Sequence, residues 1–304
     1  MQYSLLLVTA LALGQGEPLG SGDHKRTITV DDQKRQHRIH VPANYDPKKP
    51  ASVVLALHGA VMDGLLMEGF TGLTKTADEH NFIVVYPNGT GPGGIFLTWN
   101  AGMFPGELNK VKVDDVKYLG KVLDDVESVL NVDKKRVYAT GLSNGGMMCY
   151  RLASEMSDRI AAIAPVAGTM AVEKYEPKRP VSVVHFHGTE DRLVPFKGPE
   201  MKKDVPNYMK FRSVDDTIAA CLKANGCVNK PTEIDVPTKE DKIKVKRRDY
   251  GKCKEDAEVV LYIIETGGHT WPGRNIAPAF LGISTRNISA NDVMWEFFKK
   301  HPLK

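Results

Sequence analysis

The chain has 304 residues, with 41 Lys and Arg against 37 Asp and Glu, which gives a formal net charge of +4. Hydrophobic residues make up 42% and charged residues 26% of the sequence, which excludes a disordered chain, a collagen-like chain and a small disulfide-stapled scaffold. The basic residues are dispersed, so no nucleic-acid partner is expected. The densest basic stretch, 242–248, alternates Lys with Ile and Val and indicates a solvated strand face.

An apolar run, 5–13, lies near the N-terminus and ends close to the small residues Ala12 and Gly14. It is too short to span a membrane and predicts a secretory signal over residues 1–16, although no Lys or Arg precedes it. A buried first strand or an unprocessed tail is the alternative. No other segment reaches the length of a membrane span, so no membrane partner is expected. We expect residues 17–304 to form a single domain that is secreted or periplasmic.

Strand-like and helix-like patterns alternate along the chain. Two segments, 27–30 and 37–41, flank a polar turn and predict a hairpin. Runs rich in Val and Ile predict strands buried on both faces at 53–57, 82–86, 136–139, 181–186 and 259–264. Helical spacing of apolar residues marks 113–130, 146–160, 214–224 and 291–300. This alternation predicts an α/β fold, a mostly parallel doubly wound sheet with helices on both faces, and an irregular excursion at 195–237.

The sharpest local signal is Gly-Leu-Ser-Asn-Gly-Gly at 141–146, which follows one predicted strand and begins a predicted helix. Strand, tight turn and helix are the context in which a G-x-S-x-G motif holds a nucleophilic serine exposed at a helix N-terminus. We therefore expect Ser143 to be a catalytic nucleophile. The alternative is a plain glycine-rich turn.

A serine hydroxyl needs a base, and the base needs an orienting acid, which in this architecture follow in the order Ser, Asp or Glu, His. Asp191 lies just past the strand 181–186 and is the expected acid, and its neighbour Glu190 is the alternative acid. The alternative role for Asp191 is that of a turn residue that makes an Asx hydrogen bond. His269 follows the strand 259–264 and is flanked by Gly268, which suits an imidazole that must reach the nucleophile. A turn or core histidine is the alternative there.

The oxyanion of the reaction needs two backbone N–H donors, and we expect them from Asn144 and Ala60. His58, beside Ala60, is expected to brace its loop rather than to titrate. Trp99 and Trp271 are candidate flat walls for a substrate, with loop packing as the alternative, whereas Trp295 is expected in the core.

These motifs jointly resemble a known family over residues 53–298. In order they are Leu-His-Gly at 57–59, Tyr-Pro-Asn-Gly at 86–89, Thr-Trp-Asn-Ala-Gly at 98–102, Val-Asp-Asp-Val at 113–116, the serine motif at 141–146, His-Gly-Thr-Glu-Asp at 187–191 and Gly-His-Thr-Trp-Pro-Gly at 268–273. They resemble the secreted polyhydroxybutyrate-depolymerase and feruloyl-esterase-like group of α/β-hydrolases, often placed in carbohydrate esterase family one. The chain departs from this group at 103–105, where Met-Phe-Pro stands and members often carry a cysteine pair.

The resemblance implies the same catalytic residues, Ser143, Asp191 and His269, and the same oxyanion positions, Ala60 and Asn144. It also implies a disulfide between Cys227 and Cys253, and it assigns no partner to Cys149 or Cys221. We therefore expect ester hydrolysis through an acyl-enzyme, with no metal and no cofactor. The expected substrates are feruloyl, acetyl-xylan or aryl esters, and the alternative is a polyester depolymerase.

Two other classes of protein remain as alternatives. His185 and His187 point to one strand face, a spacing that metal sites use, so a metallohydrolase is the first. A binding protein on a hydrolase scaffold is the second, although the intact order of Ser, Asp and His speaks against it. The oligomeric state is not readable from the sequence.

Overall fold

The computed structural model describes residues 17–102, 113–199, 210–228, 230–251 and 253–304. The predicted signal, 1–16, and the Met-Phe-Pro departure at 103–105 lie outside the described residues. Within the described part of the chain, no helix is both long and apolar enough to cross a membrane.

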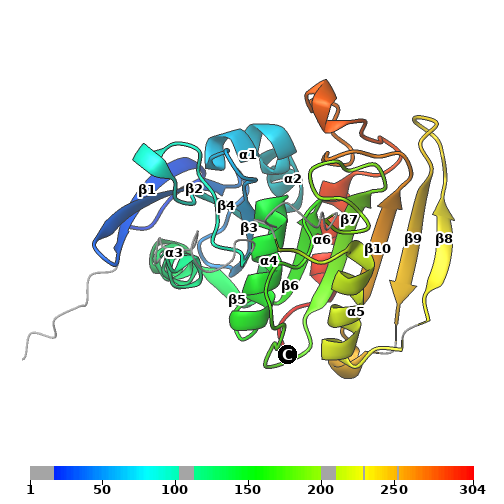
Figure 1. The fold of residues 1–304 in the computed structure, drawn as a ribbon. Helices are drawn as coiled ribbons and strands as arrows, with labels where there is room; N and C mark the ends of the chain where they lie inside the picture. The colour runs from blue at the N-terminus through cyan, green and yellow to red at the C-terminus, as the bar shows by residue number, and fades with distance from the viewer. Residues whose placement is uncertain (1–16, 103–112, 200–209, 229, 252) are drawn as a thin grey trace, which may run out of the picture.

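A single mixed sheet runs through the molecule, in the order β1-β2-β4-β3-β5-β6-β7-β10-β9-β8 (Figure 1). The strands are β1 Gly22–Val30, β2 Gln33–Val41, β3 Ala51–Leu57, β4 Ile83–Pro87, β5 Val132–Leu142, β6 Ala162–Val166, β7 Ser182–Gly188, β8 Thr232–Val236, β9 Val245–Tyr250 and β10 Val259–Ile264. From β4 to β10 the neighbours pair in parallel, and the outer strands on each side pair antiparallel. The prediction of a mostly parallel sheet is therefore confirmed.

Helices cover both faces of this sheet, as the sequence predicts. One face carries α3 Asp115–Val129, α4 Asn144–Glu155 and α5 Val214–Asn225, and the other carries α1 Gly64–Thr71, α2 Leu73–His80 and α6 Ala290–Lys300. Parallel strands need this double cover because a crossover helix returns over each face of the sheet. Each side has its own apolar core, and the predicted core residue Trp295 stacks on Phe82 with 4.2 Å between ring centroids.

Five elements differ from the prediction. The expected helix at 146–160 ends at Glu155, and the strand β6 follows it. The sequence did not predict β6, because its five apolar residues are buried on both faces and show neither helical nor alternating periodicity. The helices α1 and α2 have eight residues each and are divided by Gly72 at φ 60°, so neither carries a sustained periodic pattern. The expected irregular excursion, 195–237, ends in the exposed edge strand β8.

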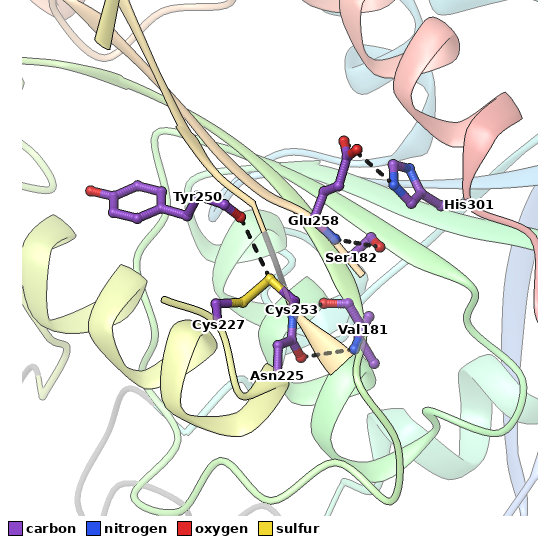
Figure 2. The surroundings of a disulfide bond; sticks show 8 residues. All are labelled: Val181, Ser182, Asn225, Cys227, Tyr250, Cys253, Glu258 and His301. Atoms are coloured by element: carbon purple, nitrogen blue, oxygen red, sulfur yellow. Dashed lines mark hydrogen bonds and ion pairs between the residues drawn. A yellow bond between two sulfur atoms is a disulfide. The ribbon is translucent and has the colours of Figure 1, made fainter. Parts of the chain in front are cut away.

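A disulfide and two hydrogen bonds connect the end of α5 to the amino ends of β7 and β10, at the opposite end of these strands from the predicted site (Figure 2). The predicted disulfide is confirmed: it joins Cys227, just after α5, to Cys253, just before β10. Asn225 accepts a hydrogen bond from Val181 N and donates one to Val181 O, which pins the end of α5 to the start of β7. Cys149 and Cys221 are free and buried.

Candidate active site

Ser143 occupies a strained turn between β5 and α4. Its φ of 55° and ψ of −119° lie in a region that L-residues rarely adopt, which costs free energy and is typical of functional turns. The close packing of the turn excludes larger residues nearby, since a Cβ on Gly145 would lie 2.2 Å from Leu57 O and one on Gly168 would lie 2.2 Å from Ser143 O. The glycines of the motif therefore serve this geometry.

The serine stands where a nucleophile could meet a ligand. Its amide donates to Val166 O at 2.9 Å, which fixes the end of β5 against β6, and its side chain is half-buried. Within the described residues, the Ser143 hydroxyl makes no hydrogen bond. It follows that this hydroxyl is available to a substrate or to a neighbouring base.

Asp191 and His269, far apart in the sequence, lie in direct contact. Asp191 Oδ2 accepts a hydrogen bond from His269 Nδ1 at 2.8 Å, and both side chains are buried. Asp191 Oδ1 accepts from the amides of Leu193 and Val194 at 2.9 and 2.8 Å, so the carboxylate is held from both sides. The alternative acid, Glu190, is exposed. The arrangement leaves His269 Nε2 as the nitrogen that would face a substrate.

The loops that carry these two residues are joined by backbone hydrogen bonds. Thr189 N donates to Ile264 O at 3.0 Å, and Glu190 N donates to Gly267 O at 2.9 Å. Only glycine fits at Gly188 and Gly268, because a Cβ there would lie 2.2 Å from Gly267 O and 2.1 Å from Leu281 O, respectively. These glycines let the loops after β7 and β10 approach closely enough for the carboxylate to reach the imidazole.

The topology brings Ser143 to the same edge of the sheet. It follows β5, whereas Asp191 follows β7 and His269 follows β10, and these parallel strands are separated only by β6. Carboxyl ends of parallel strands share one edge, where ligands bind in open α/β sheets. Ser143 and His269 are not hydrogen-bonded in the described structure, which is common for catalytic groups without a substrate.

The two proposed oxyanion donors are unpaired in the described residues: neither the Ala60 N–H nor the Asn144 N–H donates a hydrogen bond. The Asn144 side chain is fully engaged, since its Oδ1 accepts from Trp99 N at 2.6 Å and from Thr98 Oγ1 at 2.9 Å. This side chain locks the loop after β4 to the start of α4, a role that the sequence did not reveal.

His58 braces the loop that carries Ala60. Gly89 N donates to His58 Nε2 at 2.9 Å, so the proton is on Nδ1, which donates to Gly59 O at 2.7 Å. Burial lowers the pKa of His58 to about 4, so the ring is neutral near pH 7. This agrees with the bracing role expected for it.

The two candidate substrate walls pack inside the loops. Trp99 and Trp271 are 1% and 0% exposed, so neither presents a face to a ligand in this structure. The Trp99 indole N–H donates to His58 O at 2.9 Å, and that of Trp271 donates to Asn291 Oδ1 at 2.8 Å. The loop-packing alternative therefore describes both residues better than the substrate-wall prediction.

His185 and His187 form part of a buried hydrogen-bonded chain rather than an open ligand pair. Tyr150 Oη lies 2.7 Å from His185 Nδ1, His185 Nε2 lies 3.0 Å from His187 Nδ1, and His187 Nε2 donates to Val194 O at 2.8 Å. All four ring nitrogens are thus in use. Among the described residues, no cluster of three or more potential metal ligands is found, so the metallohydrolase alternative gains no support.

Comparison with known proteins shows which sequences and folds this chain is similar to. The prolyl oligopeptidase family model matches residues 69–191. The chain is 30% identical over 290 residues to the protein named "Putative esterase NocK" of Nocardia uniformis subsp. tsuyamanensis, covering 90% of this chain and 81% of that protein. It is 27% identical to feruloyl esterase C of Emericella nidulans, and the match covers 98% of this chain and 99% of that protein. An acetyl xylan esterase from Aspergillus awamori shares the fold, with a TM-score of 0.61 and 15% identity over 91% of this chain and 99% of that one.

Proposed function

Since the chain belongs to the feruloyl esterase-like family of α/β-hydrolases and is a serine carboxylic-ester hydrolase, we propose that it cleaves feruloyl and related aryl or acetyl esters carried on plant polysaccharide. The observation that carries this proposal is the 2.8 Å hydrogen bond between Asp191 and His269 at the sheet edge where Ser143 follows β5. The polyester-depolymerase alternative is not favoured, because the relatives above carry no such name.

The reaction we propose proceeds through an acyl-enzyme. His269 Nε2 takes the proton of Ser143 as Oγ attacks the ester carbonyl, and the N–H groups of Ala60 and Asn144 stabilise the oxyanion, each by about 3 kcal/mol. Collapse breaks the bond to the alcohol oxygen, which receives the proton from His269. His269 then deprotonates a water as the water oxygen attacks the acyl carbon, and it passes this proton to Ser143 Oγ as the bond between Oγ and the acyl carbon breaks. Asp191 holds the Nδ1 proton throughout.

Exposed apolar side chains around the site support an ester with an aromatic or similarly apolar acid. Most of the large apolar side chains that stay exposed lie on segments that follow β3, β4, β7 or β10, namely Val61, Leu65, Leu66, Ile95, Phe96, Leu193, Ile276, Phe280 and Ile283. Figure 1 shows the segments after β4 and β10, which carry the short turns η1 Pro92–Gly94 and η4 Ala279–Leu281, at one end of the sheet. Apolar side chains on the loops that follow the strands of the site could contact an apolar acid group of the substrate.

A cavity beside the loop after β4 offers room for such a group. It has a volume of about 670 Å³, and its lining includes Gly89, Gly91 and Thr98. Thr98 connects it to the site, because its hydroxyl donates to the side chain of Asn144, the residue after the nucleophile. A mostly preformed cavity of this size suits an aromatic acid better than acetate alone.

A rate panel tests the substrate. We expect kcat/KM to be higher for methyl ferulate than for acetylated xylan, and hydroxybutyrate oligomers to be the poorest substrates. Phe96→Ser and Phe280→Ser should raise KM for methyl ferulate several-fold and change that for p-nitrophenyl acetate less. Ile234→Ser, which alters an exposed residue on the edge strand β8, is the matched control. Fastest turnover of hydroxybutyrate oligomers would reverse the assignment.

We also propose that the protein works outside the cytoplasm. The disulfide between Cys227 and Cys253 supports this, because such bonds persist in oxidising compartments. Removal of residues 1–16 as a signal is part of the proposal. N-terminal sequencing of exported protein should begin near residue 17, and exported protein that still begins at Met1 would disprove the signal.

A further inference from the structure

A buried polar chain links the helix of the proposed nucleophile to the loop of the proposed acid. Tyr150 lies on α4, the helix that begins directly after Ser143, and His185 and His187 lie on β7. These three side chains are no more than 1% exposed. Burying polar groups costs free energy unless every one is hydrogen-bonded, and apolar residues would fill the same space at less cost. Packing alone therefore does not account for this chain.

The acceptor at one end determines which atom donates in each hydrogen bond of this buried polar chain. Val194 O can only accept, so His187 Nε2 carries a proton, and a neutral His187 must then accept at Nδ1 from His185 Nε2. His185 Nδ1 in turn accepts from the Tyr150 hydroxyl. Burial lowers the pKa of both histidines, which keeps the rings neutral, and raises that of Tyr150, which keeps its proton. All the N–H and O–H dipoles thus point toward the loop 189–195.

The series of hydrogen bonds through Tyr150, His185 and His187 ends beside the carboxylate of Asp191. His187 Nε2 lies 3.5 Å from Asp191 Oδ2, the same oxygen that accepts from His269. Its hydrogen bond to Val194 O also steadies the residue whose amide holds Asp191 Oδ1. His187 therefore acts on both oxygens of the carboxylate, on one through its positive N–H and on the other through the backbone of Val194.

We propose that His187, backed by His185 and Tyr150, is a positioning residue of this hydrolase, which keeps Asp191 aligned with His269 and partly compensates its charge. The inference rests on the proposed function of Ser143, Asp191 and His269. Without the His187 N–H, the negative charge of the Asp191 carboxylate would be less compensated and would attract a neighbouring positive charge more strongly, so the acid limb of the pH profile should move to higher pH.

The groups that face this chain come from several elements. His187 is faced by Asp191 from the loop after β7, by His269 from the loop after β10 and by the ring edge of Phe196, with 5.8 Å between centroids. Those that face Tyr150 are Cys149 on α4, Cys221 on α5 and Tyr175. The thiols stay protonated, because burial raises the pKa of Cys149 and raises that of Cys221 to about 12. A change in the pH profile near neutrality therefore does not come from these thiols.

The test uses the full chain, p-nitrophenyl acetate and kcat measured against pH. His187→Leu should lower kcat about tenfold with little change in KM, and should move the acid limb of the profile upward by about half a pH unit. His187→Gln, which restores a donor near Nε2, should recover most of both effects. Tyr150→Phe removes one oxygen from the far end and should move the limb upward by less.

Tyr138→Phe is the matched control, because the buried Tyr138 hydroxyl has no hydrogen-bond partner among the described residues. It should leave the profile unchanged. If His187→Leu folds and keeps kcat and the limb of the wild type, the inference is wrong, even if its melting temperature falls. If His187→Leu does not fold, a profile of Tyr150→Phe that matches that of Tyr138→Phe would overturn it.

The wild type and Ser143→Ala, measured in the same assay, distinguish a failure of the proposed function from a failure of the inference about His187. A wild type that hydrolyses no ester would remove the proposed function and this inference with it. An active wild type, an inactive Ser143→Ala and unaffected His187 and Tyr150 variants would remove this inference alone.

Discussion

The backbone of Ser143 is strained, and this strain makes a prediction about stability. A φ of 55° with a ψ of −119° suits glycine, whereas alanine keeps the Cβ that opposes it. Ser143→Gly should therefore be more stable than Ser143→Ala by about 1 kcal/mol, and both should be inactive. Urea unfolding of the two variants at one pH measures the difference. A Gly variant that is clearly less stable than the Ala variant would contradict the strained turn.

Buried neutral histidines should make the protein lose stability on mild acidification. The pKa of His58 falls from the ordinary 6.5 to about 4 because of burial, and burial also lowers the pKa values of His185 and His187. Between pH 6.5 and pH 4 the unfolded chain binds more protons than the folded one. The contribution of these rings to stability is therefore complete above pH 6.5 and declines as the pH falls toward 4. For His58 alone the loss approaches roughly 3 kcal/mol.

The free energy of unfolding measured from pH 7.5 to pH 4.5 checks this decline. His24→Gln, at a half-buried position on β1, should follow the wild-type curve, whereas His58→Gln should show a shallower one. A wild-type stability that stays level or increases through this range would show that the three rings are not buried in neutral form.

Among the elements, α4 depends on how closely its first turn approaches β3. A Cβ at Gly145 would lie 2.2 Å from Leu57 O and 2.6 Å from His58 O, both backbone atoms that cannot yield easily. Gly145→Ala should therefore destabilise the protein by about 2–4 kcal/mol and displace the loop of Ala60, with loss of activity. Thermal unfolding and esterase rate measure the two effects.

Gly120 provides the matched control within a helix. It lies inside α3, and a Cβ there would meet only Met156 Cε, at 3.7 Å, an ordinary contact. Gly120→Ala should stabilise the protein by about 0.5–1 kcal/mol and leave the activity unchanged. Effects of the same sign at both glycines would mean that close packing at Gly145 does not determine the response.

The strong local signals of the sequence predicted their elements well. The serine motif predicted the strand, turn and helix around Ser143, because small residues and a tight turn are encoded within six positions. By contrast, α1, α2 and β6 are too short to show a period, and their conformation depends on the sheet they pack against. The order of elements was predictable where each carried its own pattern and not where packing decided.

Contacts between distant residues were predictable only in part. The order of Asp191 and His269 along the chain indicated their pairing, and the family resemblance indicated the disulfide. The chain through Tyr150, His185 and His187 was missed, because positions 35 residues apart in the sequence carry no signal of a hydrogen bond. The spacing of the two histidines pointed to a metal only because their buried partners were unknown.

For the whole molecule, the disulfide and the candidate active site lie at opposite ends of the strands of one sheet. The bond closes a sequence separation of 26 residues near the amino ends of β7 and β10, whereas Ser143, Asp191 and His269 follow carboxyl ends. Cys227→Ser/Cys253→Ser should therefore lower stability by about 3 kcal/mol without changing kcat/KM where the protein is folded. Calorimetry and ester hydrolysis by the same sample check both. A loss of kcat/KM in the folded double variant would show that the two ends of the strands are coupled.

The central claim is that Ser143, Asp191 and His269 act as one unit, and covalent labelling by a serine-directed p-nitrophenyl phosphonate tests it most directly. Intact mass and peptide mapping should show one adduct per chain, on Ser143, formed slowly in Asp191→Asn and not measurably in His269→Gln. An adduct on another residue, or labelling of His269→Gln at the wild-type rate, would contradict the account.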